Sequence, residues 1–282
     1  MSVSRGLFKR ARGRLQREGA RATAVRAVKY LSFRMKVNDP IARLRKRISK
    51  DFFVKFDGVI QYGPLKGFRL NETFSWGGFG DRAAMLFGLY EQEILEVVTS
   101  LPSRYRTLVD IGAADGYYAA GLVKSGLVDR SICFEITKFG QEVIAEVAAR
   151  NGVSDRVKIF GAADASLVAK VQSCSVNFEE CVVICDVEGE EFSLFTTEVL
   201  STFRRSVVII ELHPEIAFET HDAVEALRIR ASKYFSVSQF KTGPRDPARF
   251  SELQHLDDSS RWLLCSEGRP RVQFWFRLDP LK

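Results

Sequence analysis

The middle of the chain alternates between short apolar runs and longer stretches whose apolar residues recur at helical spacing. The apolar runs lie at residues 107–111, 131–134, 157–160, 182–185 and 207–212. The helical stretches between them lie at residues 117–124, 139–151 and 192–203. Continuous apolar runs are typical of strands buried on both faces, and parallel strands need helical crossovers. The pattern therefore predicts a doubly wound α/β fold with a mostly parallel sheet.

The C-terminal part continues with shorter elements. Its pattern predicts a helix near residues 221–233, a strand near 235–240, a polar loop at 241–260 and further strands near 262–265 and 272–276. Because no long helical pattern separates the last strands, we expect them to pair antiparallel.

The segment before this core has a different pattern. Residues 52–70 contain short apolar and aromatic runs broken by turn signals such as Gly63-Pro64, which is typical of a β-hairpin. Apolar residues at helical spacing predict one helix over residues 82–99. A small β element and a helix at residues 51–100 are thus expected to precede the main domain at residues 101–282.

Positive charge is concentrated at the N-terminus. Residues 1–50 hold 16 Lys and Arg against two acids, whereas the rest of the chain holds 26 against 33, so the net charge of +7 conceals an acidic remainder. We predict that this segment is a basic helical arm that contacts an anionic membrane surface or another polyanion. A solvated arm without a partner and an Arg-rich organelle transit peptide remain alternatives, because charge alone does not separate them.

Composition narrows the class of protein. The 282 residues are 46% hydrophobic and 27% charged, which excludes wholesale disorder. The longest apolar runs, such as residues 207–210, are far shorter than the roughly 20 residues of a membrane span. The five cysteines are odd in number and form no CxxC pair, which favours a reduced compartment. We expect a cytoplasmic protein, with a peripheral location at the membrane surface as the alternative.

A glycine-containing loop follows the first apolar run, in the sequence DIGAADGY at residues 110–117. Gly112 and Gly116 permit a tight turn and a close approach to a ligand, and Asp110 places a carboxylate at the end of the strand. A dinucleotide site would read GxGxxG, and an acid here would repel a pyrophosphate. The loop favours a cationic, nucleotide-like ligand. S-adenosylmethionine, with its sulfonium, ammonium and ribose groups, meets this description.

Two further acids occur at the ends of the next strands. Glu135 is expected to accept the ribose hydroxyls, and Asp164 is expected to meet the adenine amine. The predicted cofactor site consists of Asp110, Gly112, Ala113, Asp115, Gly116, Glu135, Ala163, Asp164 and Asp186. Tyr90 and Glu91 either edge this pocket or belong to a helix surface.

A second polar group follows the fourth and fifth runs. Side chains two apart share one face of a strand, so Asp186 and Glu188 are expected to point together, as are Glu211 and His213. We predict catalytic roles for His213, Asp186 and Glu188, with His213 or Glu188 taking the proton of an acceptor hydroxyl. The alternatives are a helix cap at Glu188 and a simple turn at His213. The group could also ligate Mg²⁺ or Mn²⁺, although no metal is assigned.

The segments DIGAADGYY at 110–118, DVEGEE at 186–191 and ELHP at 211–214 together resemble the FkbM-like branch of the class I S-adenosylmethionine-dependent methyltransferases. The resemblance covers about residues 85–240. It implies a Rossmann-like, seven-stranded sheet with an antiparallel C-terminal strand, and an enzyme that methylates oxygen. Ile184 stands where many relatives carry lysine, so the substrate class of this protein is open.

The predicted function is S-adenosylmethionine-dependent O-methylation of a sugar, a glycan or another small-molecule hydroxyl. One alternative keeps the cofactor and transfers the methyl group to RNA or to a protein nitrogen, with the basic arm as the docking element. The sequence lacks the Asn/Asp-Pro-Pro-aromatic motif that often marks methylation of amino groups. A third interpretation is a non-enzymatic interaction module on a methyltransferase fold. The sequence does not determine the oligomeric state.

Overall fold

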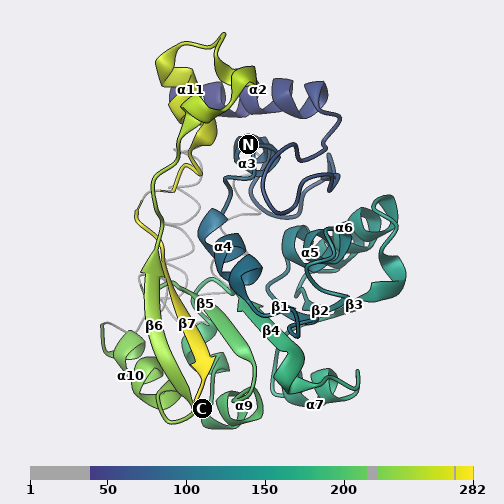
Figure 1. Cartoon of the computed structure of the whole chain (residues 1–282), viewed down its shortest axis with the longest axis vertical. Helices are drawn as coiled ribbons and strands as arrows, with labels where there is room; N and C mark the ends of the chain where they lie inside the picture. Colours follow the sequence, from purple (N-terminus) through teal and green to yellow (C-terminus); the bar gives the residue numbers. More distant parts are fainter. Residues whose placement is uncertain (1–38, 215–220, 270, 282) are drawn as a thin grey trace, which may run out of the picture.

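The computed structural model describes residues 39–214, 221–269 and 271–281. These residues form one central sheet and the helices packed around it (Figure 1). Most of the predicted basic arm at residues 1–50 lies outside the described residues. Among the helices that the structure describes, none combines the length and the apolar character needed to cross a membrane.

Seven strands form the sheet in the order β3-β2-β1-β4-β5-β7-β6. β7 pairs antiparallel with β5 and β6, whereas the other neighbouring strands pair parallel. The strands are β1 (Thr107–Ile111), β2 (Arg130–Phe134), β3 (Val157–Phe160), β4 (Cys181–Cys185), β5 (Val207–Leu212), β6 (Phe235–Lys241) and β7 (Phe274–Pro280). The predicted fold class, a doubly wound and mostly parallel α/β sheet with an antiparallel C-terminal strand, is confirmed.

Helices cover both faces of the sheet, and strand residues alternate between two hydrophobic clusters. In β4, Val182 and Ile184 belong to one cluster, and Val183 and Cys185 belong to the other. The first face carries α5 (Tyr117–Lys124) and α6 (Lys138–Arg150), and the second carries α7 (Leu167–Gln172), α8 (Glu191–Leu194), α9 (Thr197–Thr202) and α10 (His221–Ala231). Burial on both faces explains why the strands read as continuous apolar runs.

The segment before the sheet differs from its prediction. The helix α2 (Pro40–Lys55) is capped by Asp39, whose carboxylate accepts a hydrogen bond from the backbone nitrogen of Ile41. The predicted boundary between the arm and the β element, at residue 50, therefore falls inside α2. The helix also includes the first residues of the expected hairpin. Only one antiparallel bridge, between Val59 and Arg69, remains of that hairpin among the described residues. In the apolar run at its start, Phe52 and Phe53 lie on the buried face of this helix, whereas Val54 is exposed.

The helix predicted over residues 82–99 is two helices, α3 (Phe79–Leu86) and α4 (Gln92–Ser100). Gly88 lies between them at a φ of +65°, and a Cβ at this position would lie 2.4 Å from the carbonyl oxygen of Tyr62. This backbone contact requires glycine and ends α3. Periodicity could not reveal the break, because Phe87 and Leu89 are as buried as the helical residues beside them.

The strand predicted near residues 262–265 is wrong, because these residues end the helix α11 (Asp258–Cys265). The Asp257 carboxylate caps α11 by accepting a 3.0 Å hydrogen bond from the backbone nitrogen of Ser260. Figure 1 shows α11 beside α2, so segments from opposite ends of the described chain meet. A short apolar run is compatible with a strand or with a buried helix, and here the cap decides between them.

Candidate functional site

The loop between β1 and α5 lies directly against the end of β4. Gly112 has a φ of +88°, and a Cβ added to it would lie 1.8 Å from the carbonyl oxygen of Asp186. Gly116, at a φ of +78°, immediately precedes α5. Glycine at position 112 is therefore required by the contact with Asp186, whether or not a ligand is bound.

A pocket opens at the carboxyl ends of β1 and β4, where the order of the strands reverses. Ligands of open α/β sheets bind at this kind of crevice. The predicted site residues that line this carboxyl-end pocket are Asp110, Gly112, Ala113, Asp115 and Asp186. Four aromatic side chains also line it, namely Trp76, Tyr90, Tyr117 and Tyr118. Glu91 is 3% exposed and belongs to the lining as well, so its interpretation as a surface acid is wrong.

Two carboxylates at this pocket each have an oxygen without a hydrogen bond in the described part of the chain. Asp110 is 2% exposed, and its buried Oδ2 atom has no such partner. Burial raises the pKa of Asp110 to about 7, although a backbone hydrogen bond from Ala119 opposes this rise. Oδ1 of Asp186 is also buried without a hydrogen bond. Since buried polar atoms are normally hydrogen-bonded, these two oxygens indicate a place for a ligand's donors or positive charge.

Asp115 connects the glycine loop to the segment before α3. Its Oδ2 atom pairs with Nη2 of Arg82 at 2.7 Å, and its Oδ1 atom accepts a 2.6 Å hydrogen bond from the backbone nitrogen of Ser75. The Arg82 side chain is 3% exposed, so this ion pair is shielded from solvent. Asp115 lines the pocket as predicted, but both its oxygens are occupied by protein groups.

Glu135 and Asp164 lie outside the lining of the pocket. Oε1 of Glu135 accepts a 2.8 Å hydrogen bond from the backbone nitrogen of Thr137, and Oε2 accepts one of 3.2 Å from Ala114 in the glycine loop. Asp164 is exposed, and hydrogen bonds from Ser166 lower its pKa to about 2. The structure thus places Glu135 at the edge of the loop and Asp164 at the surface. Their roles, and that of Ala163, stay predictions.

The ends of β4 and β5 bring Asp186, Glu211 and His213 together, as the sequence predicted. Nε2 of His213 lies 3.7 Å from Oδ1 of Asp186 and 3.5 Å from Oε1 of Glu211. Nδ1 of the same ring lies 3.5 Å from Oε1 of Glu191, whose side chain is fully buried. This Glu191 oxygen also accepts a 2.6 Å hydrogen bond from the backbone nitrogen of His213. We call these four residues the histidine cluster.

The predicted pairing of Asp186 with Glu188 on one strand face is wrong, because β4 ends at Cys185. Glu188 lies in the following turn at a φ of +53°. Burial and the nearby charges of Glu211, Glu91 and Glu188 hold the pKa of Asp186 well above its ordinary value. Glu188 therefore acts on Asp186 through its charge.

His213, one of the two predicted proton acceptors, does not have the near-neutral pKa that suits a general base. Burial favours the neutral ring, but the contacts with Glu191 and Glu211 and the charge of Asp186 raise the pKa of His213 to about 11. A ring in this environment is protonated at neutral pH and cannot accept a further proton. The physical reason is that three carboxylates surround one imidazole.

Two arginines that were not predicted from the sequence balance these acids. Nη1 of Arg269 pairs with Oε1 of Glu211 at 2.7 Å, its Nε pairs with Glu267 at 2.7 Å, and its Nη2 pairs with Glu91. Arg245 pairs with Glu267 at 2.5 Å and extends the network. Most of these partners are far apart in sequence, so no motif marks the arginines. The only local signal is the order Glu-Gly-Arg at residues 267–269.

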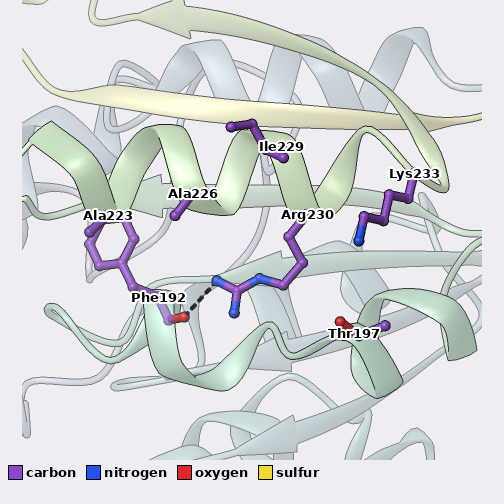
Figure 2. A pocket seen from close by; sticks show the side chains of 7 residues that line it. All are labelled: Phe192, Thr197, Ala223, Ala226, Ile229, Arg230 and Lys233. Atoms are coloured by element: carbon purple, nitrogen blue, oxygen red, sulfur yellow. Dashed lines mark hydrogen bonds between the residues drawn. The ribbon is translucent and has the colours of Figure 1, made fainter.

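A second pocket, with a volume of about 500 Å³, lies between α10 and the α8–α9 segment. Figure 2 shows Arg230 reaching across it to Phe192, whose carbonyl oxygen accepts a 3.0 Å hydrogen bond from Nη2. Among the described residues that line it there is no acid, imidazole or thiol group, and none of them also lines the carboxyl-end pocket. The candidate chemistry therefore lies at the carboxyl ends of the strands.

No family model matches the chain, and no curated protein is significantly similar to it. Among solved structures, ribosomal protein L11 methylase from Lactobacillus delbrueckii subsp. bulgaricus has 14% identity and a TM-score of 0.42, over 76% of this chain and 86% of that one. An O-methyltransferase from Bacillus cereus in complex with SAH has 14% identity and a TM-score of 0.41, over 68% and 80%. The METTL16 methyltransferase domain has 14% identity and a TM-score of 0.46, over 68% of this chain and 67% of that one.

These TM-scores are below 0.5, so the similarities carry no argument about this chain. The strand order and the antiparallel β7 identify the Rossmann-like fold of class I methyltransferases, which the motif resemblance implied. Membership of the FkbM-like branch is not confirmed by the comparisons and stays a prediction.

Proposed function

We propose that this protein is an S-adenosylmethionine-dependent methyltransferase. The observation that carries the proposal is the pair Asp110 and Asp186, which line one pocket on either side of Gly112. Each has a buried oxygen without a hydrogen-bond partner among the described residues. A cation or hydrogen-bond donors would stabilise the ionised form of such buried carboxyl groups, and S-adenosylmethionine offers both.

The same lining disfavours a dinucleotide. A pyrophosphate would meet the carboxyl groups of Asp110 and Asp186. Arg82 is the only Lys or Arg among the described residues of the lining, and it already pairs with Asp115. The absence of a GxGxxG loop supports the same conclusion. We place Glu135, Ala163 and Asp164 on the ribose and adenine side of the ligand, because the Glu135 carboxylate contacts the edge of the loop.

When bound, S-adenosylmethionine supplies a methyl group that an acceptor oxygen can attack while the electron pair of the carbon–sulfur bond moves to sulfur. The chain's own part is to exclude water, to orient the acceptor and to accommodate its proton. Asp186 connects the two sides of the site, since it lines the pocket and contacts His213. We infer an acceptor hydroxyl on a sugar, a glycan or another small molecule, because carboxylate oxygens accept hydrogen bonds from hydroxyl groups.

The charge of the N-terminal segment supports a second candidate, in which RNA or a protein is the acceptor. Residues 1–50 carry 16 Lys and Arg, and a segment with this charge is attracted to the phosphates of RNA and to anionic lipids. Removing residues 1–38 should weaken binding to RNA or to anionic vesicles in low salt and leave binding of S-adenosylmethionine unchanged. Equal binding of both polyanions by the two proteins would contradict this candidate.

Calorimetric titration of S-adenosylmethionine tests the main proposal. We expect Asp110→Asn to weaken binding by about 10- to 100-fold, the effect of a lost charge-assisted contact. Asp155→Asn is the matched control, because it removes the same charge from an exposed position away from the pocket. If S-adenosylmethionine does not bind the wild-type chain, or if Asp110→Asn binds it as tightly as the control does, the cofactor assignment is wrong.

A further inference from the structure

The histidine cluster has the spacing of a metal site. One oxygen of Asp186, one oxygen of Glu211 and one ring nitrogen of His213 all lie within 4.8 Å of one another. An ion such as Mg²⁺ bonds its ligands at about 2.1 Å, so the ligand atoms around it range from about 3 Å apart when adjacent to about 4.2 Å apart when opposite. The separations of 3.7 Å and 3.5 Å from Nε2 of His213 to the two carboxylates are in this range.

The surroundings of His213 favour a metal ligand over an ordinary core histidine. Its side chain is 7% exposed, and its Nδ1 atom is buried without a hydrogen bond in the described part of the chain. Nδ1 faces Glu191, which is held in place by backbone hydrogen bonds from His213 and Gly189. Metal-binding histidines commonly direct their second ring nitrogen at such a carboxylate. This arrangement leaves Nε2 directed toward Asp186 and Glu211.

Glu211 keeps the capacity to bind an ion although it has protein partners. Its Oε1 atom contacts Arg269, and its Oε2 atom accepts a 3.1 Å hydrogen bond from Nε1 of Trp275. Each carboxylate oxygen has two lone pairs, so one donor at Oε1 leaves one lone pair available. Arg269 also pairs with Glu91 and Glu267, so its single charge is shared among three carboxylates.

We propose that Asp186, Glu211 and His213 bind one divalent cation beside the carboxyl-end pocket, that the ion takes the place of the proton on Nε2 of His213, and that Glu191 orients the ring. One imidazole and two carboxylates suit an ion that accepts both nitrogen and oxygen, such as Mn²⁺, better than Ca²⁺. The use of this ion rests on the proposed function, but its binding does not. In that reaction the ion would polarise the acceptor hydroxyl, whose proton leaves to solvent as the oxygen bonds to the methyl carbon and the carbon–sulfur pair moves to sulfur.

Titration of Mn²⁺ alone into the full chain, followed by electron paramagnetic resonance, tests the site. We expect one bound ion per chain, and spin-echo modulation from a coordinated ¹⁴N nucleus. His213→Gln and Glu211→Gln should each weaken Mn²⁺ binding at least tenfold, whereas Asp155→Asn, which lies outside the cluster, should not change it. Circular dichroism spectra that match the wild type identify the variants that remain folded.

Two results would overturn the metal site: no stoichiometric Mn²⁺ binding, or bound Mn²⁺ without nitrogen modulation in the wild-type chain. Both results are obtained with the wild-type chain, so the proposal stays testable even if a substitution prevents folding. Titration of S-adenosylmethionine in a separate experiment distinguishes the two proposals. Cofactor binding without Mn²⁺ binding removes only the metal, whereas Mn²⁺ binding without cofactor binding removes the proposed function and leaves the metal site.

Discussion

The two halves of the candidate site are built in different ways. The glycine-loop half comes from one contiguous segment, residues 110–116, whose shape depends on close contact with the backbone of Asp186. The half around the histidine cluster and Arg269 is assembled from four distant segments, and opposite charges hold it together. We therefore expect the first half to be destabilised by a side chain added at a glycine, and the second half to be destabilised by the loss of one partner of an ion pair.

Removing the central cation should produce the largest effect. Arg269→Met keeps a long side chain but leaves Glu91, Glu211 and Glu267 without their shared partner. Breaking a buried ion pair costs about 3 to 5 kcal/mol, and urea unfolding should show a loss of this size. Arg106→Met removes an arginine from the exposed pair with Asp129 and should leave the free energy of unfolding nearly unchanged. Similar losses in both variants would contradict the distinction between the two halves.

Adding a side chain in the glycine loop should produce a slightly smaller loss of the free energy of unfolding. Gly112→Ala combines an unfavourable positive φ with a clash against the carbonyl oxygen of Asp186, and we expect a cost of about 3 kcal/mol. Gly126→Ala has a similar φ of +74° but no atom within 4 Å of the added Cβ, so it should cost only about 1 to 2 kcal/mol. Thermal and urea unfolding would compare the two variants. A Gly112→Ala variant as stable as the control would show that the loop can move away from β4.

The smallest effect concerns protonation of Asp110. Because its pKa is raised to about 7 in the folded chain, the folded state retains a proton that the unfolded chain loses near pH 4. Stability therefore falls as pH rises toward and through 7, and between pH 6 and 7.5 this carboxyl should lower the free energy of unfolding by about 1 kcal/mol. Asp110→Asn should lack this part of the pH dependence in ligand-free protein. An unchanged pH profile in the variant would show that Asp110 is already ionised and compensated.

Elements whose signal is local were predicted well. The strands at residues 107–111 and 207–212 and the glycine loop between β1 and α5 follow from runs of neighbouring residues. The helix break at Gly88 was missed because it is decided by a contact with Tyr62, which is distant in sequence. The helical state of residues 262–265 was missed although its cap, Asp257, lies only a few residues away. Asp186, Glu211 and His213 were grouped correctly, since the ends of adjacent parallel strands must meet.

The fold class and the position of the carboxyl-end pocket could be predicted from the order of residues, because apolar periodicity and glycine placement act within a few residues of the chain. The charge state of the site depends on contacts between distant segments. Burial raises the pKa of Asp110, three carboxylates keep His213 protonated, and Arg269 reaches Glu91 from far along the chain. Electrostatic energies depend on distance and on exclusion of water, and neither quantity can be read from the order of residues.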